Sequence, residues 1–338
     1  MSFTLYKPLT AFAAILLIAI GVSSAQKSSE RLLPVEIEGR WGFIDTSGHL
    51  VIGADFDFVW GFSEGFASAW KDGQAGYVDE SGGLIVVPQF HYARGFSEGL
   101  AAIEQSGKWG YVNTHGTLVI PPRYKEAQAF SEGLAAIQAD SGLWGFVDKN
   151  GIETIKPQFS HAWSFSEHVA PVYRGKRCGF IDANGTVVVP FRFNECAGMK
   201  DGIGVVRVNK LDGFINASGD FFITPRFENA ELFFDGLALA KQNGKWGYIG
   251  KDGQFVIPPQ FEYSSVEPTI THFSEGLAGV TRGGKFGYID KTGAFVIALQ
   301  FHKGGPFKDG IAEVCNSRCG YIDMHGARIW PTDTSQAP

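Results

Sequence analysis

Four cysteines are the residues whose type and spacing point most directly to a covalent chemistry. Cys178 and Cys196 lie within one segment of the chain, and Cys315 and Cys319 flank a short turn near its end. An even number of cysteines favours disulfides in an exported protein. Of the three pairings that four cysteines allow, we predict Cys178–Cys196 and Cys315–Cys319. The alternative is a metal site, but the spacing lacks a CxxC pair and fixed histidine partners.

The short motifs that mark common catalytic centres are missing from the sequence. It contains no HExxH, GxSxG, P-loop or dinucleotide fingerprint. The eight histidines are scattered, and the two that share a repeat position, His115 and His325, occupy a polar turn. Lysine and arginine form no runs, and the net charge is −6, so no nucleic-acid partner is indicated. We predict no enzyme activity, cofactor or metal; a hydrolase with an unfamiliar site is the less favoured alternative.

One acidic position recurs along the chain and is followed by glycine in all but one case, where His168 follows. A carboxylate at such a position can bind local backbone N–H groups at the entrance of a strand. Alternatively, a line of acids could attract cations or a basic partner. We favour the structural interpretation, because a feature of every repeat serves the repeat. The acids are Glu64, Glu98, Glu132, Glu167, Asp201, Asp235, Glu275 and Asp309.

These residues belong to a sequence repeat that covers nearly the whole chain. An anchoring glycine returns every 33 to 35 residues, apart from one step of 40. The repeat gives eight full units and a truncated ninth, which predicts one continuous array over residues 32–331. The anchoring glycines are Gly42, Gly76, Gly110, Gly145, Gly179, Gly213, Gly247, Gly287 and Gly320.

The repeated motifs resemble the bacterial WG-repeat family, also called KWG repeats. The resemblance is carried by 108–111 (KWGY), 120–124 (IPPRY) and 130–135 (FSEGLA), and again by 245–248 (KWGY) and 258–261 (PPQF). The position before the anchoring glycine departs from the pattern, because only four of nine units keep tryptophan. Tryptophan is therefore not required in each unit. The nine residues are Trp41, Ala75, Trp109, Trp144, Cys178, Asp212, Trp246, Phe286 and Cys319.

Each unit has the pattern of three β-strands. In the third unit these are 109–113, 117–120 and 133–138, and a turn closed by Gly116 joins the first two. Asp or Asn opens this turn in eight of nine units, which suits a type I turn with a bulge. A proline then follows and is expected to end the second strand, since it cannot donate a ladder hydrogen bond. These prolines are Pro88, Pro121, Pro157, Pro190, Pro225 and Pro258.

Three aromatic positions per unit predict a core that neighbouring units share. One follows the anchoring glycine, as Tyr111 does; the other two, such as Tyr124 and Phe130, bracket a loop and are usually six residues apart. That spacing would suit a turn of helix or an irregular corner. A unit of this size cannot bury three aromatic side chains alone, so they should pack against the next unit. An exposed strip that stacks on sugar rings is the alternative.

Two architectures are compatible with an all-β array of such units. We expect an open superhelical solenoid with simple caps at both ends; the alternative is a closed, propeller-like ring. The lone third strand at 32–38 and the final unit, which stops at 330–331, would together complete one circularly split unit. Nine three-stranded units are, however, unusual for propellers, whose blades have four strands and number four to eight.

The first 25 residues have the features of a cleavable export signal. Lys7 precedes the apolar stretch 9–22, which is short for a bilayer span, and 23–25 offers small residues for cleavage. An uncleaved anchor is the alternative. We therefore predict an exported mature protein, periplasmic or extracellular, with no membrane span after cleavage. Residues 332–338 should form a disordered tail.

The unit with the 40-residue step contains an insert between Phe261 and Phe273, which predicts a binding loop. A neutral extension is the alternative. We predict that the whole array is a non-catalytic scaffold for another macromolecule, a protein partner, because extended repeats offer large interfaces. Glycan or envelope-polysaccharide binding through exposed aromatics is the second hypothesis. The candidate contact residues are Tyr263, Val266, Glu267, Pro268, Ile270 and His272.

Overall fold

The structure is a computed structural model that describes residues 31–262 and 271–331. These residues belong to one compact unit. All regular elements in them are β-strands, so the predicted all-β class is confirmed. The predicted signal segment 1–25, the tail 332–338 and most of the insert lie outside the described residues.

The strands form nine antiparallel sheets, called blades 1 to 9 in chain order. Blade 1 contains β1 (Leu33–Ile37), β2 (Arg40–Ile44) and β3 (Leu50–Phe56). Blade 2 contains β4 (Phe58–Val59), β5 (Phe66–Lys71), β6 (Gln74–Asp79) and β7 (Leu84–Phe90). Blade 3 contains β8 (Tyr92–Ser97), β9 (Leu100–Gln105), β10 (Lys108–Asn113) and β11 (Leu118–Tyr124). Blade 4 contains β12 (Glu126–Ala127), β13 (Leu134–Gln138), β14 (Trp144–Asp148) and β15 (Glu153–Phe159).

The remaining blades repeat this plan. Blade 5 contains β16 (His161–Ala162), β17 (Ala170–Arg174), β18 (Arg177–Ile181) and β19 (Val187–Phe193). Blade 6 contains β20 (Glu195–Lys200), β21 (Ile203–Val208), β22 (Leu211–Asn216) and β23 (Phe221–Phe227). Blade 7 contains β24 (Asn229–Phe234), β25 (Leu237–Gln242), β26 (Lys245–Ile249) and β27 (Phe255–Phe261). Blade 8 contains β28 (Leu277–Arg282), β29 (Lys285–Asp290) and β30 (Phe295–Phe301). Blade 9 contains β31 (Lys303–Gly304), β32 (Ile311–Cys315), β33 (Cys319–Asp323) and β34 (Arg328–Trp330).

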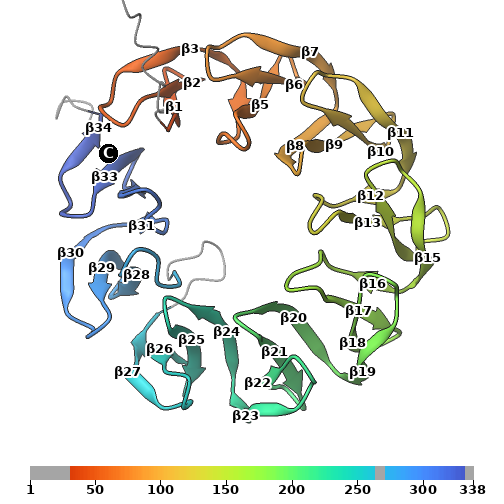
Figure 1. Cartoon of the computed structure of the whole chain (residues 1–338). Coiled ribbons are helices and arrows are strands. Elements are labelled where there is room, and N and C mark those ends of the chain that lie inside the picture. The colour runs from red at the N-terminus through yellow and green to blue at the C-terminus, as the bar shows by residue number, and fades with distance from the viewer. Residues whose placement is uncertain (1–30, 263–270, 332–338) are drawn as a thin grey trace, which may run out of the picture. The chain divides into compact units, whose positions relative to one another are not determined.

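The blades are arranged in a closed ring around a common axis (Figure 1). The expectation of an open solenoid is therefore wrong, and the alternative of a closed, propeller-like ring is correct. Blades 1 and 9 join by packing rather than by sharing strands, because Leu33, Val35 and Ile44 cluster with Ile311 and Tyr321. The Tyr321 hydroxyl donates a hydrogen bond of 2.7 Å to the carbonyl of Pro34, across 287 positions of the sequence.

The expectation of three strands per unit is wrong for most blades, which have four. The additional strand lies in the loop between the aromatic brackets, where a helical turn or corner was expected. In blade 4 it is β12, only two residues long, and it pairs with the end of β13. Since β11 leads directly into β12, the sequence repeat is offset from the blade. Each repeat thus begins in one blade and ends in the next, which links neighbouring blades covalently.

The anchoring glycine is required by a bulge in the outer strand of its blade. Trp109 pairs with Tyr124 and Tyr111 pairs with Ile120, so three residues of β11 face Gly110 alone. A Cβ atom on Gly110 would lie 2.4 Å from the carbonyl oxygen of Ile120. The prolines lie inside the outer strands, in this bulged stretch, and the expectation that proline ends the strand is wrong. Bulges and edge strands tolerate proline because no ladder N–H is needed there.

The aromatic core lies between blades, as predicted. The ring centroids of Tyr111 in blade 3 and Phe130 in blade 4 are 4.8 Å apart, and both side chains are buried. The Tyr111 hydroxyl also donates to the carbonyl of Gln128 at 2.7 Å. Corresponding ring pairs recur around the ring at 4.7 to 5.1 Å. The alternative of an exposed strip at these positions is therefore wrong.

The recurrent acid binds backbone N–H groups of the next blade, not the local ones that we expected. Glu64 accepts hydrogen bonds from the backbone amides of Glu98 and Gly99, at 2.6 and 2.8 Å. The same contact joins Glu275 to the backbone amides of Asp309 and Gly310. Because each acid has a positive φ, about 50 to 55°, its turn directs the amides toward the preceding blade.

The serine before the acid completes this contact. The Ser63 hydroxyl donates to the carbonyl of Phe96 at 2.6 Å, and Ser97 donates to Phe130 at 2.7 Å. Thus the serine and the acid of the repeated FSEG motif both bind the next blade. Their recurrence is explained by the assembly of the ring.

The interblade carboxylates make stability depend on pH. Burial raises the pKa of Glu98, but hydrogen bonds from Lys149 and the Gly133 amide outweigh it, and the pKa lies below its ordinary value of 4.5. A carboxylate whose pKa is lowered by folding stabilises the fold at pH values above its pKa in the unfolded chain. This contribution disappears as the pH falls through its pKa in the folded protein. We expect Glu98→Gln to cost less than about 1 kcal/mol at pH 7. The difference from the wild type should shrink below pH 4.5 in denaturant titrations.

Glu80→Gln is the matched control, since Glu80 is an exposed turn residue. It should leave the pH dependence of unfolding unchanged. An equal loss for Glu98→Gln at every pH would show that the carboxylate charge has no part in the interblade contact.

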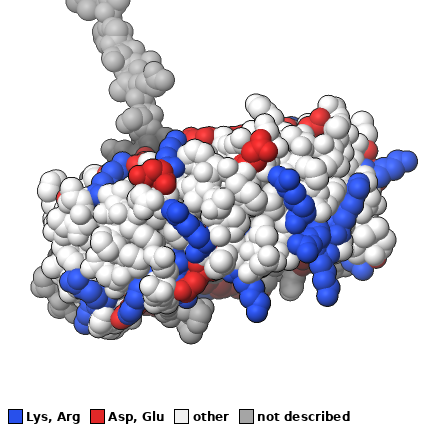
Figure 2. All heavy atoms as spheres, turned by 90° about the horizontal axis from the view of Figure 1, so that it is seen from below, with Lys and Arg blue, Asp and Glu red and all other residues white. Residues whose placement is uncertain are grey.

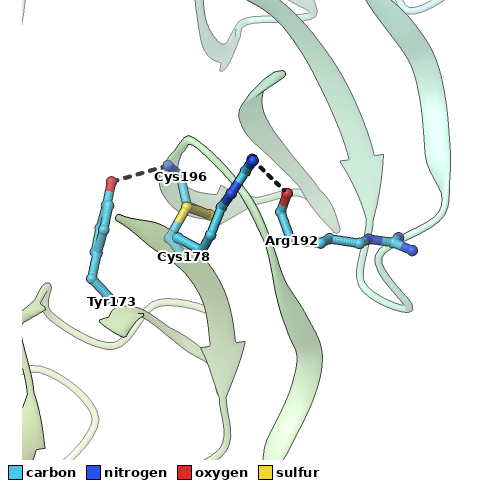
Figure 3. The surroundings of a disulfide bond; sticks show 5 residues. Tyr173, Cys178, Arg192 and Cys196 are labelled. Atoms are coloured by element: carbon cyan, nitrogen blue, oxygen red, sulfur yellow. Dashed lines mark hydrogen bonds between the residues drawn. A yellow bond between two sulfur atoms is a disulfide. The ribbon is translucent and has the colours of Figure 1, made fainter. Parts of the chain in front are cut away.

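Both predicted disulfides are present. Cys178 on β18 bonds to Cys196 on β20, with a Cα–Cα distance of 6.1 Å, so this bridge joins blades 5 and 6. The Cys196 amide donates to the Tyr173 hydroxyl at 3.2 Å (Figure 3). Cys315 and Cys319 are paired residues of one hairpin in blade 9. Two bridges in the described residues fit a protein that folds in an oxidising compartment.

Candidate functional site

One position of the inner strands varies widely in chemistry while its backbone is held in place. The amides of Trp60, Gln128 and Trp163 each donate to the neighbouring strand at 2.9 to 3.0 Å. A fixed backbone with a variable side chain is the arrangement expected of a contact surface in a repeat protein. We call these the variable inner residues: Trp60, Arg94, Gln128, Trp163, Ala197, Glu231, Thr271 and Gly305.

Six aromatic side chains form a continuous surface across blades 1 to 3. Successive ring centroids along it are 5.1 to 5.7 Å apart, and most of the contacts are edge-to-face. Trp60 is 47% exposed and Tyr92 is 38% exposed, Trp109 is buried, and the other three side chains are partly buried. The members of this aromatic surface are Trp41, Phe58, Trp60, Trp70, Tyr92 and Trp109.

An arginine ends the aromatic surface at blade 3. The Arg94 guanidinium lies 4.6 Å from the centroid of Trp109, and one of its terminal nitrogens lies 3.6 Å from a carboxylate oxygen of Glu126. Its Nε is buried and has no hydrogen-bond partner within the described ranges. A hollow of about 630 Å³ adjoins this end. It is lined by His91, Tyr92, Glu104, Ser106, Gly107 and Trp109.

A second aromatic group lies on blades 4 and 5. His161 is 5.0 Å from Trp144, 4.7 Å from Trp163 and 6.0 Å from Tyr173, measured between ring centroids. Burial lowers the pKa of His161, which is therefore neutral at pH 7 and acts as a packing partner. Trp163 is 47% exposed, as Trp60 is at the same repeat position of blade 2.

The outer face offers a different chemistry. Large uncharged areas separate the lysine and arginine side chains on the face shown in Figure 2. Apolar residues at the start of the outer strands, such as Leu50, Leu118 and Phe221, are exposed in most blades. Val87 within β7 and Ile152 just before β15 are more exposed still, at 61 and 62%. Similar apolar side chains recur at the start of the outer strands in most blades. This uniform surface offers little basis for selectivity between partners.

The insert that we predicted as a binding loop is described only at its end. Tyr263, Val266, Glu267, Pro268 and Ile270 lie outside the described residues. His272 lies beside blade 7, where its ring stacks on Phe234 with the centroids 3.9 Å apart. Burial lowers its pKa, so it too is neutral at pH 7. The binding role of this loop stays a prediction.

One group of three metal-ligand side chains occurs in the part of the chain that the structure describes: Glu313, Cys315 and Cys319. The two sulfur atoms are bonded to each other, so neither is a free thiolate. In the same described part, no helix is long and apolar enough to cross a bilayer.

Sequence reasoning missed the aromatic surface because it concentrated on constant positions. A partial signal was present: the position two residues before the second bracket holds Trp60, Arg94 and Trp163 in different units. A comparison of repeats by their variability would have identified Trp60 and Arg94, but not the other members of the aromatic surface. The serine–acid contact between blades had a signal too, since both residues return at the interval of the repeat.

Comparison with known proteins gives the family and the fold. A family model described as WG containing repeat matches residues 41–74, 76–109, 109–141, 144–178, 179–211, 213–246, 246–286 and 286–317. A search of the curated proteins found no match. The computationally designed Ika8 protein is 13% identical, with a TM-score of 0.51 over 87% of this chain and 100% of that chain. The eukaryotic initiation factor is 13% identical, with a TM-score of 0.60 over 88% of this chain and 95% of that chain.

At this identity the two structures show a common fold and nothing about function. The family model matches successive segments that together span residues 41–317, in step with the repeat described above. This chain therefore belongs to the WG containing repeat family.

Proposed function

We propose that this chain is an exported, non-catalytic scaffold that binds a protein partner through the aromatic surface of blades 1 to 3. The observation that carries the proposal is the unbroken run of six aromatic rings that ends at Arg94. Tryptophan, tyrosine and arginine are the residues that most often dominate the binding energy of protein interfaces. The predicted N-terminal signal and the two disulfides support export.

The geometry of the surface suits a protein partner. Trp60 and Tyr92 are exposed, while Trp109, whose ring contacts Tyr92, is buried and lies against Arg94. Rigid aromatic side chains lose little conformational entropy when they bind, so contact with them is efficient. The adjacent hollow of about 630 Å³ could receive one side chain of the partner.

Affinity capture from the native cell envelope tests this proposal. We compare the wild type with Trp60→Ala/Tyr92→Ala by quantitative mass spectrometry, and then measure direct binding of each captured protein. Removal of two interface anchors should weaken binding by about 2 kcal/mol or more, which is about 30-fold in Kd. Val87→Ala/Ile152→Ala, in β7 and just before β15, is the matched control and should bind as the wild type does.

Equal capture by the wild type and by the aromatic variant, with both proteins folded, would place the contact elsewhere. Loss with the outer-strand variant alone would assign binding to the outer face.

A further inference from the structure

A cavity of about 700 Å³ lies at the inner edges of blades 5 and 6, away from the aromatic surface of blades 1 to 3. Its volume falls in the range of pockets that enclose small ligands. The indole of Trp163 lies on one side, and Glu195, Arg207 and Asn229 lie on the side of blades 6 and 7. Gln128 and Tyr173 complete its polar lining. The cavity thus combines one exposed aromatic surface with several hydrogen-bonding groups.

The cavity lies where blade 6 has small side chains and its two neighbours, blades 5 and 7, have large ones. Its variable inner residue is Ala197, which aligns with Trp163 in blade 5 and Glu231 in blade 7. Gly198 follows, and a Cβ atom there would lie 2.8 Å from the Ser166 hydroxyl. The small residues Ala197 and Gly198 of this one repeat therefore leave space between Trp163 and blade 7.

An ion pair between the partly buried Arg207 and the buried Asp212 lines the cavity. Arg207 donates to both carboxylate oxygens of Asp212, at 2.6 and 2.9 Å, and also contacts Glu195 at 3.0 Å. Asp212 is 3% exposed and replaces the tryptophan of other repeats, such as Trp144 and Trp246. A buried ion pair seldom stabilises a fold more than an apolar side chain does. Asp212 also accepts a hydrogen bond of 2.8 Å from the Ala230 amide of blade 7, so it fixes the position of Arg207 at the edge of the cavity.

We propose that this cavity binds a neutral oligosaccharide, with one sugar ring stacked on Trp163. The face of a pyranose ring is apolar C–H surface, which suits an exposed indole. Its hydroxyls both donate and accept, which matches the Glu195 carboxylate, the Asn229 amide and the Tyr173 hydroxyl. The Tyr173 oxygen accepts from the Cys196 amide, so its proton is directed elsewhere (Figure 3).

The charges of the lining select against other ligands. Glu195 and Asp212 with Arg207 give a net charge of −1, which disfavours an anionic sugar or a phosphate. A wholly apolar ligand would cover Glu195 and Arg207 without replacing their water contacts. This inference concerns different blades from the protein surface proposed above and does not depend on it.

The experiment uses the full mature chain on an array of neutral, anionic and cationic oligosaccharides, followed by calorimetry with the best neutral trisaccharide. Trp163→Ala should weaken binding at least tenfold. Trp60→Ala is the matched control, because Trp60 has the same repeat position and the same 47% exposure, and it should bind as the wild type does. Ala197→Trp should fill the cavity and also abolish binding; both sites are exposed, so the fold should persist.

Binding of a neutral glycan that is lost in Trp163→Ala and Ala197→Trp but kept in Trp60→Ala would support the proposal. No binding of any neutral glycan by the folded wild type would overturn it. So would preferential binding of anionic or cationic sugars, or equal losses in both tryptophan variants. None of these results bears on the capture experiment, which tests the Trp60→Ala/Tyr92→Ala variant. The failure of one proposal can therefore be distinguished from the failure of the other.

Discussion

Phe130→Ala should lower the free energy of unfolding by about 3 to 5 kcal/mol. Phe130 is 1% exposed and packs at the junction of blades 3 and 4, against Tyr111 and Ala127. Its removal leaves a cavity that neither blade can close, because the Ser97 hydroxyl and the Tyr111 hydroxyl hold the two blades at a fixed separation. Denaturant titration followed by far-UV circular dichroism measures the loss.

Phe62→Ala is the matched control for this variant. Phe62 has the same repeat position beside Phe43 but is only half-buried. It should therefore lose clearly less than Phe130→Ala does. If the two variants lost the same amount, burial between blades would not be the source of the stability.

Removal of the Cys178–Cys196 bridge should cost about 3 kcal/mol. The bonded residues are 18 positions apart, and a bridge that closes a loop of this size restricts the unfolded chain by about that amount. The bridge also joins blades 5 and 6, so its loss removes one covalent link between two elements that then stay joined through one outer strand and through contacts such as Glu167 with the Gly202 amide. Thermal unfolding of Cys178→Ala/Cys196→Ala measures the effect.

The second bridge provides the comparison. Cys315 and Cys319 are 4 positions apart, and the same relation gives about 2 kcal/mol for their smaller loop. We therefore expect Cys315→Ala/Cys319→Ala to be the milder double variant. Four free thiols in protein purified from an oxidising compartment would contradict both expectations.

Local structure could be predicted from the sequence because it depends on neighbouring residues. The turn opened by Asp79 is an example: its carboxylate accepts from the amides of Ser81 and Gly83, as the Asp and Gly spacing predicts. The pairing of Cys315 with Cys319 follows equally from a short hairpin. The innermost strands were missed because a strand of two residues, such as β12, is too short to show an alternation of apolar and polar side chains.

Closure of the ring could not be predicted because it depends on the angle between successive blades. That angle is set by contacts between residues about 34 positions apart, such as Glu64 with the amides of Glu98 and Gly99. The sequence shows that these residues recur but not which backbone group each one binds. The cavity of blade 6 was missed for a related reason, since Ala197 and Asp212 meet only after folding.

The outer strands also determine where this protein can join another chain edge to edge. In blades 2 to 7 each outer strand contains proline, as Pro88 in β7 and Pro225 in β23. A proline on an edge strand blocks the row of hydrogen bonds on which strand addition and fibril growth depend. β3 in blade 1, β30 in blade 8 and the short β34 in blade 9 contain no proline. Intermolecular β-pairing, whether in a filament or with a strand donated by another protein, is therefore least obstructed at the three neighbouring blades 8, 9 and 1.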